Sequence, residues 1–314
     1  MLFLLPEGLA EWEILSAKTG LSRAELLQTL LQLKAEGFPV LVEERGAGLA
    51  PGSPAPQILF PLLRGKFGRA YRYFGFVTST QDVLRAWQDA PIGAVVLAER
   101  QTRGRGRHGR AWESPPGNLY FSVLLGKDAD PLLSLRAGLA LLEAAKVGGL
   151  KWPNDLLAPD GRKLGGILVE AEGERIFLGI GINVHVPPLP TSAALAEFRE
   201  VQRAQLLAHF LWALETWLRE KKEDVLLAWK ERNVTLGKKV VVRTGKEVFE
   251  GIALALGEEG ELVIRTKTGV HRIYAGDVVL CATDDVKDPE VGEGEAEGGG
   301  SGHGQGKGPG PSAK

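Results

Sequence analysis

The spacing of apolar residues changes twice along the chain, and each change marks a different kind of folding unit. Residues 9–36 carry apolar side chains at helical spacing, residues 70–232 alternate between strand-like runs and helical patterns, and residues 239–281 hold short runs separated by glycine. A chain of 314 residues is long enough for two or three domains. We therefore predict domains at 1–62, 63–235 and 236–283.

The first unit has the pattern of a winged helix-turn-helix. Helices are expected over Leu9–Lys18 and over Ser22 to about Glu36, where Ser22 and Glu25 form a capping box. A β-like pair follows, with one strand over 39–43 and a turn at 46–48. Helix, turn, helix and hairpin in this order predict that motif.

The middle unit is predicted to be an α+β core with one mixed sheet, and the third a small barrel. Expected central strands are 92–98, 118–125, 164–171 and 176–186, with helices at 131–147, 204–220 and 225–232. Five short strands are expected at 239–243, 247–253, 262–265, 270–273 and 278–281. Residues 284–314 lack large apolar side chains almost entirely, which predicts a disordered tail.

Composition excludes several classes of protein. The net charge of −1 gives no general attraction for polyanions, so an anion site must be local. A single cysteine, Cys281, excludes an internal disulfide framework and fits a reducing cytoplasm. We expect the Cys281 side chain to be a small buried apolar group. No segment is long and apolar enough to span a bilayer, and the first residues lack the basic flank of a signal peptide.

The segment Gly104–Arg110 concentrates cations on a glycine-rich loop. Its glycines permit positive φ and close approach of the backbone to a ligand, and its arginines suit bidentate binding of phosphate or carboxylate. Repulsion among the arginines predicts a loop that is mobile when empty and ordered by a ligand. A solvated basic loop and an arginine–glycine contact to nucleic acid are the alternatives, although the loop lies between two apolar strands.

Two further segments carry polar groups that suit a nucleotide. Lys151–Asp155 places a lysine at a strand end and Asn-Asp on a turn fixed by proline. Lys163–Glu170 begins a strand with paired glycines, which mark close approach of a ligand or of a neighbouring strand. An ordinary strand-ending turn is the alternative for the first segment when it is taken alone.

In their order and spacing these segments, with Gln101, Trp112 and Gly181–Asn183, resemble the biotin–protein ligases over residues 9–283. The resemblance implies an α+β protein with a winged helix-turn-helix, a class II synthetase-like mixed-sheet catalytic domain and an SH3-like β-barrel. It implies that a biotin carboxylate attacks the α-phosphorus of ATP in the presence of Mg²⁺, and that a lysine of a biotin carboxyl-carrier domain then takes the biotinyl group. Operator DNA and a second copy of the chain are further candidate partners.

Individual site residues are implied by the same resemblance. Lys151, Arg105 and Arg107 would be catalytic, and Asp155 would bind Mg²⁺. The residues implied for biotin are Ser79, Thr80, Gln81, Gln101, Arg105, Gly106, Arg107, Lys151, Gly165 and Gly166. Those implied for ATP are Arg107, Trp112, Asn154, Lys163 and Asn183. Packing in the core is the alternative for Trp112, and capping of a helix over 81–87 is the alternative for Ser79 and Thr80.

Two positions depart from the family pattern. Gln81 stands where the family usually has asparagine, and His108 stands where some members have arginine. The second change weakens one cation of the loop at neutral pH.

Three other functions are alternatives to the interpretation as a biotin–protein ligase. A regulator whose main role is DNA binding is one, but the expected recognition helix over 22–36 offers Arg23 and Lys34 against Glu25 and Glu36, a poor match for phosphates. A packing role for this domain is therefore favoured over DNA binding. A ligase for lipoate or octanoate is disfavoured by the Gly-Arg-Gly-Arg loop, and an RNA-binding protein by the net charge.

Overall fold

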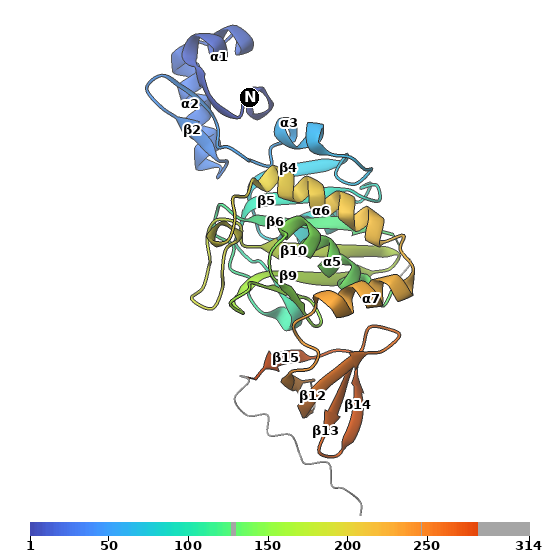
Figure 1. The fold of residues 1–314 in the computed structure, drawn as a ribbon. Helices are drawn as coiled ribbons and strands as arrows, with labels where there is room; N and C mark the ends of the chain where they lie inside the picture. The colour runs from blue at the N-terminus through green and yellow to red at the C-terminus, as the bar shows by residue number, and fades with distance from the viewer. Residues whose placement is uncertain (127–129, 246, 282–314) are drawn as a thin grey trace, which may run out of the picture. The chain divides into compact units, whose positions relative to one another are not determined.

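A seven-stranded mixed sheet forms the centre of the protein (Figure 1). The computed structural model describes residues 1–126, 130–245 and 247–281. The strand order is β4-β5-β6-β10-β9-β8-β7, and among the described strands of this sheet only β4 and β5 pair in parallel. The strands are β4 (Tyr71–Val77), β5 (Val95–Gln101), β6 (Leu119–Leu125), β7 (Gly149–Lys151), β8 (Asp155–Leu157), β9 (Lys163–Glu172) and β10 (Arg175–Ile182). The expected mixed sheet is confirmed, with three strands (β4, β7 and β8) beyond the four that the pattern indicated.

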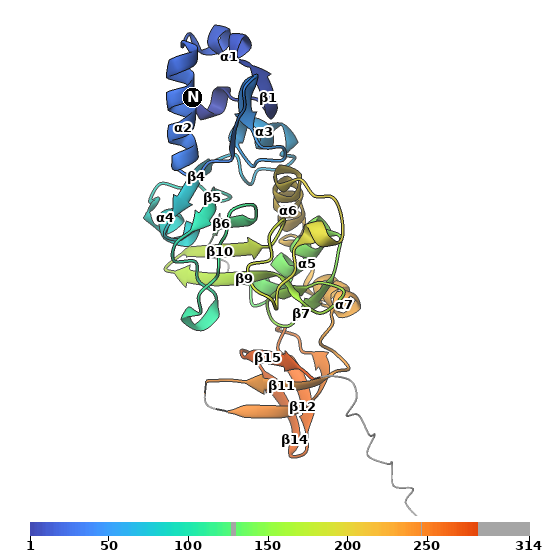
Figure 2. The same ribbon diagram turned by 90° about the vertical axis from the view of Figure 1, so that its left-hand side faces the viewer.

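Helices cover both faces of this sheet unequally. Three helices, α5 (Leu133–Ala145), α6 (Arg203–Trp217) and α7 (Lys222–Arg232), cover one face, and the short α4 (Thr80–Ala86) lies on the other (Figures 1 and 2). Side chains alternate along β5: Val95 and Leu97 enter the main core, whereas Val96 joins the small cluster under α4. The face that carries α4 is thus only partly filled by apolar side chains, which leaves room for a site.

The N-terminal unit combines two helices with a three-stranded sheet of order β1-β3-β2. Its elements are β1 (Gly8–Glu11), α1 (Trp12–Thr19), α2 (Arg23–Ala35), β2 (Val40–Val42) and β3 (Gly46–Leu49). The capping box is confirmed, since Ser22 Oγ accepts from Glu25 N and Glu25 Oε2 accepts from Ser22 N.

Short helices occur along the whole described chain, at Leu2–Leu4 (η1), Pro56–Leu59 (α3), Phe60–Leu62 (η2), Arg107–Gly109 (η3) and Leu195–Glu197 (η4).

Two local predictions in the N-terminal unit were wrong. Residues 9–11 form strand β1 instead of the first turn of a helix, and residues 46–48 belong to β3 instead of a turn. The glycines explain the second error, because a Cβ on Gly46 would lie 1.9 Å from Ala10 O and one on Gly48 would lie 1.6 Å from Gly8 O. These glycines allow β1 and β3 to pair closely, and pairing with a distant strand is invisible in local composition.

The five C-terminal strands are confirmed as an antiparallel sheet of order β14-β13-β12-β11-β15. They are β11 (Lys239–Arg243), β12 (Val248–Leu256), β13 (Leu262–Thr266), β14 (Gly269–Ile273) and β15 (Asp277–Leu280). Within the described residues the outer strands β14 and β15 do not pair, so the sheet is open, whereas a barrel requires its first and last strands to meet.

Two remaining expectations concern membrane-spanning segments and the C-terminal tail. In the part of the chain that the structure describes, no helix has the length and hydropathy needed to cross a membrane. The predicted disordered segment 284–314 lies outside the described residues.

Candidate functional site

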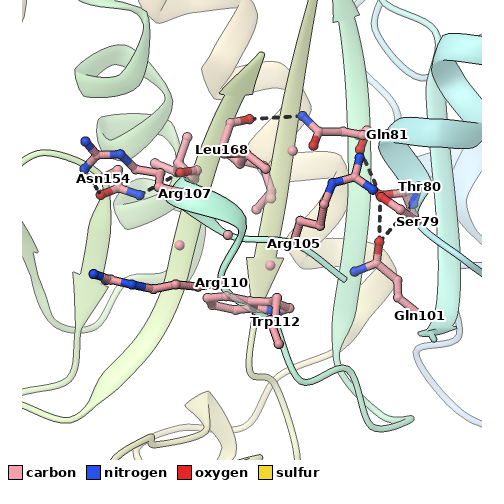
Figure 3. Close-up of a pocket in the computed structure, with 18 of the residues that line it drawn as sticks. Ser79, Thr80, Gln81, Gln101, Arg105, Arg107, Arg110, Trp112, Asn154 and Leu168 are labelled. Carbon is pink, nitrogen blue, oxygen red and sulfur yellow. Dashed lines mark hydrogen bonds between the residues drawn. The ribbon is translucent and has the colours of Figure 1, made fainter. Parts of the chain in front are cut away.

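A pocket with about 810 Å³ of empty space opens on the face of the central sheet that carries α4 (Figure 3). Among the described residues its walls come from α4, from the end of β5 and the loop after it, from the turn that leads into β8 and the first residue of β8, from strands β6, β9 and β10, and from the first residue of β15. They are Ser79, Thr80, Gln81, Gln101, Arg105, Gly106, Arg107, Arg110, Ala111, Trp112, Phe121, Ser122, Asn154, Asp155, Lys163, Gly166, Ile167, Leu168, Gly179, Ile180, Gly181 and Asp277. The structure therefore gathers most of the residues that the sequence singled out.

One end of the pocket is lined by neutral polar side chains, beside the ion pair of Arg105 with Asp82, and is called the uncharged end below. Gln101 Oε1 accepts from the backbone N of Thr80 at 2.9 Å, and Gln101 Nε2 donates to Ser114 Oγ at 3.2 Å. The hydroxyl of Thr80 lies 2.8 Å from that of Ser122. Ser79 occupies the N-cap position of α4, but its side chain makes no capping hydrogen bond. The helix-capping alternative thus applies to the position of Ser79 and not to its hydroxyl.

Gln81 joins two strands beneath this polar end. Its Nε2 donates to Leu168 O at 3.3 Å and to Phe177 O at 3.1 Å, and its side chain is buried (Figure 3). A Cβ on Gly179 would lie 3.0 Å from the Gln81 amide carbon. The glycine provides the space that the long glutamine side chain occupies.

The floor of the other end is made by glycine backbone and an indole. Gly166 and Gly181 are directly opposite in the pairing of β9 with β10, and Trp112 packs on both. Lys163 Nζ lies 5.1 Å from the Trp112 ring centroid, within the range of a cation–π contact. The buried Nε1 of Trp112 has no partner among the described residues. Gly165, which was expected here, instead faces helix α5, where a Cβ would lie 3.4 Å from a Leu141 methyl group.

Two lysines share one carboxylate beside this floor. Lys163 Nζ lies 2.7 Å from Asp155 Oδ1, and Lys151 Nζ lies 3.3 Å from Asp155 Oδ2. Lys163 lines the pocket, whereas Lys151 stands behind Asp155 and is not among the lining residues. Asn183 is also set back: its Nδ2 donates to Lys163 O at 3.2 Å, and its buried Oδ1 has no partner in the described part of the chain.

The arginines of the loop have different partners. Arg105 makes two bonds to Asp82, at 2.6 and 2.8 Å, and Arg110 pairs with Asp277. Among the described residues, Arg107 Nη1 donates to two neutral oxygens, Asn154 Oδ1 at 3.3 Å and Gly276 O at 3.2 Å. Burial lowers the pKa of the Arg107 guanidinium from its ordinary value. Arg107 is thus a partly desolvated cation whose hydrogen-bond acceptors among the described residues are neutral, while the carboxylates of Asp277 and Asp155 act on it at longer range.

Backbone conformation in the loop departs from the simplest expectation. Of its three glycines only Gly109 has a positive φ, 71°, and the neighbouring His108 also adopts the left-handed region with φ 57°. Gly104 is required for a different reason, because a Cβ there would lie 2.5 Å from Trp112 O. The glycines therefore serve one turn and one close backbone approach.

The pocket does not have the donor set of a resident metal site. Asp155, the expected Mg²⁺ ligand, is already paired with two ammonium groups. No cluster of three or more His, Cys, Asp or Glu residues in the described ranges could hold a metal ion. Mg²⁺ commonly binds through substrate phosphates with few protein ligands, so it fits this pocket as a complex with a triphosphate.

Sequence reasoning missed three side chains that complete the site. Ser122 interrupts the apolar run of β6, and that interruption was a signal that could have been used. Asp82 and Asp277, which hold Arg105 and Arg110, gave no local signal because each lies far from its partner in the sequence.

Comparison with known proteins gives consistent matches. Residues 73–186 match the biotin/lipoate A/B protein ligase family and residues 235–280 match the biotin protein ligase C terminal domain. The bifunctional ligase/repressor BirA of Bacillus subtilis is 31% identical over 300 residues, which cover 85% of this chain and 92% of the relative. The biotin--[acetyl-CoA-carboxylase] ligase of Mycobacterium tuberculosis is 34% identical over 226 residues, covering 64% of this chain and 85% of the relative.

A solved structure agrees with these matches. The biotin protein ligase from Aquifex aeolicus in complex with biotin and ATP has a TM-score of 0.61 and 30% identity to this chain. The match covers 68% of this chain and 99% of the Aquifex chain.

Proposed function

The chain belongs to the biotin protein ligase family, and on that premise we propose how its residues carry out the reaction. The protein is an ATP-dependent ligase that converts biotin to biotinyl-5′-AMP and then transfers biotin to an acceptor protein. The acceptor of such an enzyme is the biotin carrier domain of a carboxylase.

The uncharged end of the pocket suits the ureido ring of biotin. A ureido group offers two N–H donors and one carbonyl acceptor, and it carries no charge. Ser79, Thr80 and Gln101 present hydroxyl and amide groups on buried or partly buried side chains. Gln81 closes the pocket below them through its bonds to β9 and β10. Neutral hydrogen-bonding groups recognise a neutral polar ring without the cost of burying a charge.

Arg107 is the observation that carries the assignment of the charged end. Its partly desolvated guanidinium holds only neutral oxygens, so a carboxylate or phosphate oxygen entering the pocket would gain a charge-assisted hydrogen bond. In the first step a carboxylate oxygen of biotin forms a bond to the α-phosphorus, and the bond from that phosphorus to the bridging oxygen breaks, releasing pyrophosphate. Positioned cations lower the repulsion between the two anions and stabilise the charge of the transition state.

Lys163 and Lys151 supply further positive charge, because their two ammonium groups share the single carboxylate of Asp155. Lys163 faces the pocket and is placed to contact a phosphoryl oxygen, while Lys151 holds the other oxygen of the carboxylate. We assign to both lysines the stabilisation of negative charge near the α-phosphate. Mg²⁺ bound to ATP would supply further positive charge to the phosphates, in addition to the charge of these lysines.

The indole of Trp112 provides the aromatic surface for the adenine side. Asn154 orients Arg107, and Asn183 supports the backbone carrying Lys163, so both act on the nucleotide end through cations. Gly166 lets the indole lie directly on the sheet. In the second step the lysine amine of the acceptor attacks the acyl carbon, AMP leaves and the amine loses a proton; no side chain of this chain needs to act as a nucleophile.

The assignment is tested by mixing the purified protein with biotin, ATP and Mg²⁺ and analysing the bound material by mass spectrometry. Biotinyl-5′-AMP should appear only when all three are present. Lack of the adenylate in the complete mixture would contradict the ligase assignment.

A role in DNA binding is the second candidate, because relatives whose matches cover 85% of this chain are named ligase/repressor. We interpret residues 1–62 as a winged helix-turn-helix, 63–235 as a class II synthetase-like catalytic domain and 236–283 as an SH3-like domain. On α2, Arg23 is already bound to Glu44 O and stacks on Trp12, and exposed Leu27 and Leu31 interrupt the polar surface. This surface favours the enzymatic role as the main one.

Gel-shift titrations at several salt concentrations test the second role. DNA binding through phosphates must weaken steeply as salt rises. No retardation of operator-like DNA at low salt, with and without the adenylate, would exclude a repressor role.

We propose a cytoplasmic location, because the reaction consumes ATP and modifies a carboxylase. A homodimer is a further candidate assembly, and size-exclusion chromatography with the adenylate bound tests for it.

A further inference from the structure

The loop after β5 is fastened to helix α4 by one ion pair. Arg105 Nη1 lies 2.8 Å from Asp82 Oδ2 and Arg105 Nη2 lies 2.6 Å from Asp82 Oδ1, so the guanidinium and carboxylate face each other edge to edge (Figure 3 shows the Arg105 side chain beside α4). A bidentate pair of this kind fixes direction as well as distance. The pair therefore holds the middle of the loop at α4, while backbone bonds from Thr102 N to Val77 O and from Arg103 N to Thr78 O fix its start.

The position of Asp82 connects the two walls of the pocket. Asp82 follows directly after Ser79, Thr80 and Gln81, which form the uncharged end, and Arg105 lies two residues before Arg107 in the charged end. One bidentate contact thus sets the separation between the groups assigned to biotin and the cation assigned to phosphate.

The surrounding charges make this contact more important to Arg105 than to Asp82. Arg85 Nη1 also lies 3.0 Å from Asp82 Oδ1, so the carboxylate keeps a cationic partner if Arg105 is lost. The nearest alternative for Arg105 is Glu170, at 4.0 Å, and Glu170 is already bound to Arg85 at 3.0 Å. Without Asp82, Arg105 has no uncommitted carboxylate within reach among the described residues, and the loop loses its anchor on α4.

We infer that Asp82 is a positioning residue: by holding Arg105, it keeps the Gly104–Arg110 loop closed against α4, so that Arg107 faces the pocket and the adenylate is retained. This inference rests on the proposed ligase function. It assigns to the Arg105 side chain a mechanical role, in place of direct contact with substrate. The competing arrangement, in which Asp82 merely occupies Arg105 until a ligand carboxylate displaces it, has consequences of opposite sign.

The first experiment measures the loop without any ligand. Limited trypsin digestion of the full chain, followed by mass spectrometry, reports cleavage after the arginines of the loop. Asp82→Asn should accelerate that cleavage by about threefold or more, since a bidentate pair stronger than an ordinary surface ion pair is lost. Asp160→Asn breaks a comparable carboxylate–arginine contact, with Arg162, away from the pocket, and should leave loop cleavage unchanged. Unchanged cleavage in Asp82→Asn would overturn the inference.

The second experiment measures escape of preformed biotinyl-5′-AMP. Asp82→Asn should release it at least about threefold faster, and Asp82→Glu should restore part of the retention because it keeps the charge. Arg105→Gln and the double variant should match Asp82→Asn, since both groups act through one contact and their effects should not add. Unchanged escape from Asp82→Asn, or additive effects in the double variant, would overturn the positioning role, and slower escape would show that Arg105 contacts the ligand itself.

The two measurements separate the inference from its premise. If the unaltered protein forms no biotinyl-5′-AMP, the ligase assignment fails, whereas the trypsin comparison still decides whether Asp82 fastens the loop. If the adenylate forms normally and the rate of loop cleavage is the same in Asp82→Asn and in the unaltered protein, the positioning role alone fails.

Discussion

Trp112 and Gly181 lie in direct contact, closer than any side chain at position 181 would permit. A Cβ on Gly181 would fall 2.4 Å from Trp112 Cε2, well inside van der Waals contact. The indole can lie on the sheet only because this strand presents bare backbone there. Gly166, paired opposite Gly181, extends the same flat surface.

Gly181→Ala should therefore displace the indole and weaken nucleotide binding. We expect the KM for ATP to rise about tenfold or more, since a shift of about 1 Å in a binding group can cost up to about 10²-fold, while the KM for biotin changes less. Gly179→Ala is the matched control, because its Cβ would meet the Gln81 amide at 3.0 Å and should affect biotin first. Steady-state kinetics with each substrate varied would reveal the pattern; equal effects of both variants on ATP would contradict it.

The two lysines on Asp155 should differ in their effects on adenylate formation. Lys151→Ala should leave biotin affinity largely intact and reduce pyrophosphate release by about 10²-fold, the scale for removing one positioned group that stabilises charge. Lys163→Ala should in addition raise the KM for ATP, because Lys163 lines the pocket and contacts Trp112. Full pyrophosphate release from Lys151→Ala would show that Lys163 alone serves the phosphate.

The ion pair between Glu99 and Arg203 should be important for stability. Arg203 Nη1 lies 2.6 Å from Glu99 Oε2, both side chains are almost fully buried, and Tyr73 donates to the other carboxylate oxygen at 2.5 Å. Burial, together with the Glu99 charge, raises the pKa of Tyr73, which keeps it as a donor. Glu99→Gln leaves a buried guanidinium without its counter-ion and should lower the free energy of unfolding by about 3–5 kcal/mol.

Urea denaturation followed by circular dichroism measures this loss. Asp160→Asn, which breaks an exposed pair with Arg162, should change the transition far less. Equal midpoints for Glu99→Gln and the unaltered protein would contradict the assignment of a buried, paired carboxylate.

His209 should make stability depend on pH near neutrality. Burial, and secondarily the charge of Lys146, lowers the pKa of His209 below its ordinary value of about 6.5. The unfolded chain therefore takes up a proton at a pH where the folded protein does not, and the free energy of unfolding falls as pH drops from the ordinary value towards the lowered one. His209→Gln should flatten this slope in urea titrations between pH 5 and 8; an unchanged slope would remove His209 as its cause.

Much of the architecture was predictable because its causes are local. The capping box of Ser22 and Glu25, the helix of residues 133–145 and the five C-terminal strands follow from side-chain periodicity and glycine spacing. Local pattern failed at Gly46–Gly48, where pairing with β1 overrides the turn composition. Whether the last five strands close was likewise beyond a local pattern, since closure depends on the meeting of the first and last strands.

The candidate site shows the same division between sequence and tertiary structure. The motifs around Arg107, Lys163 and Trp112 determined the chemistry, because charge, amide and aromatic groups are properties of the residues themselves. Only the fold decided that Gly166 faces the pocket while its neighbour Gly165 faces α5, since adjacent residues of a strand point to opposite sides.

The partners of the loop arginines were also decided by tertiary structure alone. Asp82 reaches Arg105 across 23 residues and Asp277 reaches Arg110 across 167. A carboxylate at such a distance leaves no periodic trace near the loop, so the sequence determined which charges are present and the packing of distant elements determined which of them are neutralised. Arg107 remains available to an anion because, among the described residues, its hydrogen bonds go to neutral oxygens, and the nearby carboxylates of Asp155 and Asp277 are paired with lysines and with Arg110.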